Sequence, residues 1–207
     1  MPEFAPRVLE ALRQPMESGE AVIARANSHV TFPARFQLVA AMNPCHCGMA
    51  GTVGHVCARG AGCEERYRAR LSGPLLDRID LTIEMPAVSA RDLVAPATGE
   101  ASGAVRARVK RAREIQLRRF EELGHPEVAA NAEAPATLIE DSSPLEPGAR
   151  ALLGDAADRL SLSARSYFRV IRIARTLADL DGDDELGRHH IAEALAYRGL
   201  EGFRRAA

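Results

Sequence analysis

The sequence predicts an α/β region over residues 1–90, a connecting region over 91–148 and an all-helical region over 149–207. Two short apolar runs, FQLVAAM and LTIEM, have the length and residue types of strands buried in a parallel sheet. After residue 100, apolar residues recur only at helical spacing. A chain of 207 residues can bury a sizeable core without disulfides or metals.

The elements expected in the first region alternate between helices and strands. They are a helix over 3–14 ended by Pro15 and the Ser18-Gly19 pair, a hairpin over 21–25 and 29–36 with Asn27-Ser28 at its turn, a strand over 36–42, helices over 64–71 and 74–78, and a strand over 81–85. Asn43-Pro44 closes the first apolar strand, and Pro86 stops the second.

The remaining elements are helices and loops. An arginine-rich helix is expected over 102–123, a long loop with little structure over 124–148, and helices over 147–160, 163–180 and 187–198. Ser163 has the side chain of an N-cap for the second of these three helices.

Composition excludes several classes of protein. The formal net charge of −1 rules out a generally basic nucleic-acid coat, so any nucleic-acid contact must be local. No apolar run approaches the ~20 residues of a membrane span, and no signal-type stretch opens the chain. We therefore expect a cytoplasmic protein with no membrane partner. Lys110 is the only lysine and follows no glycine-rich turn, so a phosphate loop of the G-x-x-x-x-G-K-[ST] kind is not present in the sequence.

All cysteines lie in one loop, as Cys45, Cys47, Cys57 and Cys63. Four thiolates could surround a tetrahedral Zn²⁺, and the glycines around them would allow tight folding. The spacing lacks the paired C-x-x-C of zinc ribbons. A glycine-rich loop with reduced thiols is the alternative.

Three polar residues lie at the ends of predicted strands or helices, where ligand groups often gather. Asn43 follows an apolar strand and could orient a water against a phosphate, or it could simply form a turn. Arg78 precedes the strand over 81–85 and could reach a neighbouring subunit's nucleotide, or it could pair with a local aspartate. Arg165 opens a helix and could bind an anion between two domains, or it could be a surface arginine.

Several strings resemble one family. PEFAPRVLEALRQPMESGE, VTFPARFQLVAAMNPC, RYRARLSGPLLDRIDL and LSARSYFRVIRIARTLADL are similar to segments of the magnesium-chelatase-like AAA+ ATPases of the ComM/YifB type. The similarity runs from residue 2 to about residue 199. It implies a partial P-loop-type α/β sandwich that lacks Walker A and Walker B, followed by a helical lid domain. The four-cysteine loop is also typical of the family.

The resemblance assigns roles to the three polar residues. Asn43 resembles the sensor-1 residue that monitors the γ-phosphate, Arg78 the arginine finger that acts across a ring interface, and Arg165 the sensor-2 arginine of the lid. Asn43 and Arg165 would therefore contact the nucleotide. The hairpin around 22–33, including Arg25, resembles an insert beside the central pore that could touch DNA.

The resemblance implies ATP-driven DNA remodelling, such as branch migration in natural transformation, by a hexameric ring. ATP and Mg²⁺ would be bound by the full-length protein only, because this chain resembles its carboxy-terminal half. We therefore expect negligible ATPase activity from the chain alone. The arginine-rich helix, through Arg106, Lys110 and Arg113, is a further candidate DNA contact or a solvated face.

Two alternatives remain. The first is a nucleic-acid-binding module that grips its partner through a zinc loop and the arginine-rich helix without nucleotide. The second is a purely structural oligomerisation fragment. We also expect self-association, because an incomplete sheet leaves an unpaired edge and an uncovered apolar face.

Overall fold

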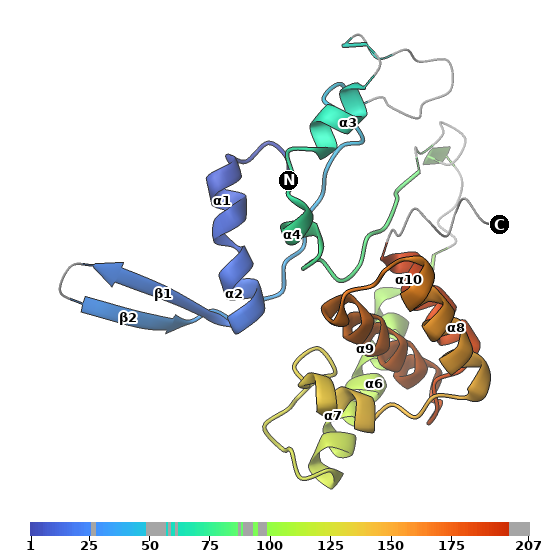
Figure 1. The fold of residues 1–207 in the computed structure, drawn as a ribbon. Coiled ribbons are helices and arrows are strands. Elements are labelled where there is room, and N and C mark those ends of the chain that lie inside the picture. Colours follow the sequence, from blue (N-terminus) through green and yellow to red (C-terminus); the bar gives the residue numbers. More distant parts are fainter. Residues whose placement is uncertain are drawn as a thin grey trace. The chain divides into compact units, whose positions relative to one another are not determined.

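The computed structural model describes residues 1–25, 28–48, 57, 59–60, 62–86, 88, 93–94 and 99–198. The chain divides into two compact units, Met1–Ile79 and Asp80–Ala207 (Figure 1). Within these described ranges, none of the helices has both the length and the apolar character that crossing a bilayer requires.

The first unit opens with two short helices where the sequence predicted one. These are α1 (Pro6–Ala11) and α2 (Arg13–Ser18), which meet at Leu12. Pro15 does not end the helix as expected, because it is the third residue of α2. Backbone N–H groups in a first turn have no partner within the helix, so proline costs little there. The predicted Ser18-Gly19 pair does end the helix, because Gly19, in the left-handed region with a φ of +69°, caps α2.

The predicted hairpin is confirmed. It consists of β1 (Glu20–Arg25) and β2 (Ser28–Pro33), which pair antiparallel with Ile23 opposite Val30 and Arg25 opposite Ser28. Ser28 begins β2 rather than forming the turn, and Asn27 lies outside the described residues. This hairpin is the only sheet in the described part of the chain.

The two strands predicted for a parallel sheet do not form. Neither residues 36–42 nor residues 81–85 form strands, and Val39 and Met85 are each 85% exposed. A buried strand needs neighbours to pair its N–H and C=O groups. No strand within the described ranges lies beside either segment.

The rest of the first unit is held by a small core. Helices α3 (Cys63–Arg68) and α4 (Gly73–Leu76) overlap the two helical ranges expected there, but each begins one residue earlier and is shorter. Leu9, Leu71 and Leu75 are buried together. The core therefore joins α1 to the segment that carries α4.

The second unit is helical, with helices over the four predicted ranges and one more, α7, in the range 124–148 where the sequence predicted a long loop. Its helices are α6 (Ser102–Glu122), α7 (Ala136–Asp141), α8 (Pro147–Arg159), α9 (Ala164–Asp181) and α10 (Arg188–Tyr197). The Ser163 hydroxyl accepts a hydrogen bond from the backbone N–H of Ser166 at 3.2 Å, which confirms the predicted N-cap. Long-range packing centres on α9, which contacts α6, α7 and α10.

One hydrophobic core runs through these five helices. Phe120 of α6, Ile139 of α7, Leu153 of α8, Ile171 of α9 and Ile191 of α10 are all fully or almost fully buried in it. A domain boundary at residue 149 stays a prediction, and α6 and α7 share their core with the helices beyond that point.

The start of the second unit is fastened to its helices. The Thr82 N–H donates to the carbonyl of Tyr197 at 2.6 Å. Asp80 Oδ1 lies 2.8 Å from Nη1 of Arg169 in α9. Residues 80–82 thus belong to the helical unit although they form no helix.

Candidate functional site

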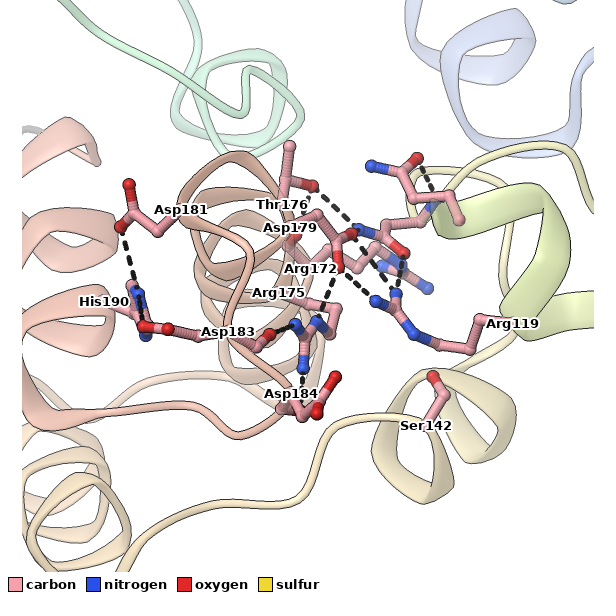
Figure 2. Close-up of polar contacts among 12 residues, drawn as sticks. Arg119, Ser142, Arg172, Arg175, Thr176, Asp179, Asp181, Asp183, Asp184 and His190 are labelled. Atoms are coloured by element: carbon pink, nitrogen blue, oxygen red, sulfur yellow. Dashed lines mark hydrogen bonds and ion pairs between the residues drawn. The ribbon is translucent and has the colours of Figure 1, made fainter. Parts of the chain in front are cut away.

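A buried polar network lies between α6 and α9 (Figure 2). Asp179 of α9 is completely buried and accepts hydrogen bonds from both Nη atoms of Arg119 on α6. Asn131, from the loop between α6 and α7, donates to the same carboxylate at 2.8 Å and to Thr176 Oγ1 at 3.1 Å. One carboxylate therefore joins two helices and a loop.

Arg175 extends this network to the end of α9. Its Nε donates to Asp179 at 3.0 Å, and its two Nη atoms donate to the carbonyls of Asp183 and Asp184. Burial lowers the pKa of Arg175, and the carboxylate of Asp179 opposes that shift. These contacts satisfy the buried charges internally, which is the arrangement of a structural network rather than of a reactive site.

Sequence reasoning missed this network. The one local signal is the spacing of Arg175 and Asp179, which places them one turn apart on α9. Arg119 and Asn131 meet Asp179 only through folding, and no local pattern marks them.

The predicted sensor-2 residue, Arg165, lies in the first turn of α9 and is exposed. It lies two residues after the Ser163 cap. Because free N–H groups gather at a helix N-terminus, this end of α9 favours negative charge. The position suits an anion-binding arginine.

Arg78, the predicted arginine finger, is buried in the first unit with 9% of its surface exposed. Its Nη1 donates to the carbonyl of Pro74 at 2.7 Å, and its Nη2 pairs with the carboxylate of Glu17. The alternative partners considered from the sequence were nearby aspartates, and the carboxylate that pairs with it comes instead from α2. The guanidinium lines a pocket of about 400 Å³ beside α2.

A second carboxylate lines the same pocket. Glu10 accepts hydrogen bonds from the Ser72 hydroxyl and from Arg13 Nη1, each at 2.5 Å. These two bonds, that of Ser72 foremost, lower the pKa of Glu10. The pocket therefore has arginine and carboxylate groups paired with one another.

Asn43, the predicted sensor-1 residue, lies in the irregular segment after residue 36 and is exposed. Asn43 and Arg78 belong to the first unit, and Arg165 belongs to the second. The Met1 ammonium donates to the carbonyl of Ala41 at 2.7 Å, just before Asn43. This bond fastens the chain start to the segment that carries Asn43.

Three of the four cysteines form one compact group, and Cys47 lies beside two of them. The Sγ atoms of Cys45 and Cys47 lie 2.9 Å apart, and those of Cys47 and Cys57 lie 3.4 Å apart. The Sγ atoms of Cys45, Cys57 and Cys63 all lie within 4.8 Å of one another. Ligands of a tetrahedral Zn²⁺ with Zn–S bonds of about 2.3 Å lie roughly 3.8 Å apart. The Cys47–Cys57 distance and the group of Cys45, Cys57 and Cys63 are near this spacing, whereas Cys45 and Cys47 lie closer together than two zinc ligands would.

Two similar turns present these sulfurs. The N–H of Gly48 donates to the Cys45 carbonyl at 3.0 Å, and that of Gly60 donates to the Cys57 carbonyl at 2.9 Å. Both glycines have a positive φ, +75° and +79°, which other residues rarely adopt. A hydrogen bond from the Arg59 backbone lowers the pKa of Cys57, but the neighbouring Cys47 and Cys63 thiols and burial bring it to about 11.

Asp181, His189 and His190 form another compact cluster. His190 Nδ1 accepts the backbone N–H of Gly187 at 3.0 Å, so the neutral ring carries its proton on Nε2. That Nε2 lies 3.2 Å from Asp181 Oδ2 and has no lone pair for a metal. His190 caps α10 through its bond with Gly187.

The residues predicted to contact DNA are all exposed. Arg25 ends β1 in the first unit. Arg106, Lys110 and Arg113 follow one another at helical spacing, so they form one basic stripe along α6. Lys110 Nζ lies 3.6 Å from Glu114, an exposed pair that contributes little to stability.

Two family models match the chain, and both describe magnesium chelatase subunit ChlI. One matches residues 1–93, and the other, for the C-terminal part of that subunit, matches residues 99–198. The competence protein ComM of Haemophilus influenzae is 43% identical over 202 residues. The protein YifB of Escherichia coli is 39% identical over 209 residues, and an uncharacterized protein of Mycobacterium tuberculosis is 41% identical over 196 residues.

These matches cover nearly all of this chain but a smaller share of the relatives. They include 97% of the chain for ComM and YifB and 95% for the mycobacterial protein. In each case the chain spans 38% of the relative's length.

Proposed function

Because the chain belongs to the family of magnesium chelatase subunit ChlI and its ComM and YifB relatives, we propose that it supplies the nucleotide-sensing part of a ring-forming AAA+ ATPase that remodels DNA. The match of both family models along the chain carries the proposal. The similarity to a competence protein supports DNA as the substrate, during natural transformation. The proposed activity on that DNA is branch migration or helicase unwinding.

The proposed partners of this part are the remaining strands of an AAA+ sheet. Residues 36–42 and 81–85 would enter that sheet, which would cover Val39 and Ile83, now 85% and 63% exposed. Asn43 would then stand at the carboxyl end of a strand, where ligands of α/β sheets bind.

In the proposed mechanism, Asn43 orients the attacking water, Arg165 holds a nucleotide phosphate, and Arg78 stabilises transition-state charge on a neighbouring subunit's nucleotide. Arg78 would have to exchange the Glu17 carboxylate for phosphate oxygens. ATP with Mg²⁺ supplies the free energy when bound by the whole ATPase. The chain alone should not hydrolyse ATP, because its only lysine, Lys110, lies within α6 rather than in a phosphate loop.

The test is a chimaera in which this chain replaces the matching segment of ComM. We expect DNA-stimulated ATP hydrolysis that Arg78→Ala lowers by about 10³-fold or more, the usual effect of losing an arginine finger. Arg68→Ala, at an exposed position of α3, is the matched control and should leave the rate unchanged. An active chimaera with equal rates for the two variants would contradict the role of Arg78.

The cysteine cluster favours a second proposal, in which Cys45, Cys47, Cys57 and Cys63 hold a structural Zn²⁺ as thiolates. The ion would cross-link the loop and take no part in hydrolysis. Such a loop also suits the alternative function, nucleic-acid binding without nucleotide. Equal DNA affinity with and without ATP in the active chimaera would favour that alternative.

A further inference from the structure

The first half of α6 carries an apolar stripe that no part of the described chain covers. Val105 and Val109 are 37% and 47% exposed, and every residue from 102 to 111 is exposed. The stripe continues through Ala112 and Phe120, which are 3% and 0% exposed. The face that packs the second half of α6 into the core therefore continues into solvent along the first half.

Formal charge also differs between the first half of α6 and the residues that follow it in the helical unit. Residues 102–113 contain five basic residues and no acidic one. Residues 114–198 contain ten basic and sixteen acidic residues, a formal charge of −6. The exposed half of α6 is thus complementary in charge to the remainder of its own unit.

A groove on α8 offers a matching surface. It has a volume of about 620 Å³, and its lining includes Leu145, Ala151 and Gly154, with Arg150, Asp155 and Asp158 beside them. The small side chains leave room for a helix to approach. The two carboxylates outnumber the one guanidinium, so the lining keeps a negative formal charge.

We propose that the first half of α6 of one copy docks into the α8 groove of a second copy. Val105 and Val109 would lie against Leu145 and Ala151, and the basic residues of the helix would face the aspartates. Because the two surfaces differ, the contact is head-to-tail and leaves a helix and a groove free for further copies. It specifies how copies join in the proposed assembly but requires neither nucleotide nor the roles of Asn43, Arg78 and Arg165.

Two variants of the full chain test the contact by sedimentation velocity. The double variant Val105→Glu with Val109→Glu removes the apolar stripe of α6, and Gly154→Trp fills the groove. Both should fold, because the valines are exposed and a Cβ at Gly154 meets no atom within 4 Å. Circular dichroism melting checks this directly.

We expect the unchanged chain to self-associate and each variant alone to do so at least tenfold more weakly. An equimolar mixture should form heterodimers, because one variant keeps the groove and the other keeps the helix. An unchanged chain that stays monomeric, variants that associate like it, or a mixture that stays monomeric would overturn the proposal. Association that appears only with duplex DNA would assign the helix to nucleic acid instead.

Discussion

Arg119 and Asp179 are 60 residues apart in the chain and form an ion pair in which the aspartate is completely buried. The same carboxylate also accepts from Asn131 and Arg175, so three polar side chains depend on one negative charge. Removing one partner of a buried pair leaves the other charges without compensation.

We therefore expect Asp179→Ala to destabilise the helical unit by about 3–5 kcal/mol. Urea unfolding followed by far-ultraviolet circular dichroism measures this change. Glu121→Ala, at an exposed position of α6, should change the free energy of unfolding by less than about 0.5 kcal/mol. Superimposable unfolding curves for the two variants would show that the network contributes no stability.

The bond between Ser72 and Glu10 predicts a dependence on pH. Because the pKa of Glu10 is lowered by folding, its contribution is present above the ordinary value of 4.5 and is lost as the pH falls toward the lowered value. Ser72→Ala should move the pKa of Glu10 upward and make the acid-side loss of stability shallower over that interval. Titration of the Glu10 carboxyl by NMR measures the shift, and Thr31→Val on the exposed hairpin should leave it unchanged.

The cysteine cluster predicts one zinc ion per chain, retained through purification without chelator. Replacing Cys45 and Cys63 together by serine should abolish the zinc and lower the melting temperature, because thiolate ligands are lost. His46→Asn should keep the zinc, because the sulfur atoms complete a tetrahedral set without the imidazole. Metal analysis of the unchanged chain and of the two variants measures the bound zinc. An unchanged chain without zinc would contradict the site.

The basic stripe of α6 predicts salt-dependent DNA binding. Replacing Arg106, Lys110 and Arg113 by alanine should weaken duplex binding and reduce the slope of log affinity against log salt by about 2.7, or roughly 0.9 for each phosphate contact. Fluorescence anisotropy over a range of salt concentrations measures the slope. The matched control replaces three exposed arginines of equal total charge, Arg150, Arg159 and Arg188, and should keep the original slope. Equal slopes for both triple variants would remove the stripe from the interface.

Local signals predicted α6, α8, α9 and α10 well, but not the short α7. Ser163 and Gly182 bound α9 because a hydroxyl cap and a left-handed glycine act within one helical turn. The strands predicted over 36–42 and 81–85 do not form, because strand pairing depends on neighbours distant in sequence. The same reason hid the pairing of Arg78 with Glu17, which lies 61 residues away.

The contacts of Asp80 and Thr82 with Arg169 and Tyr197 bear on how the protein can be dissected. A fragment designed from its helices would begin at Ser102 and would strip a salt bridge from α9 and a hydrogen bond from the end of α10. A fragment that begins at Asp80 keeps both. The useful truncation point therefore lies at an irregular stretch of backbone and not at the first turn of a helix.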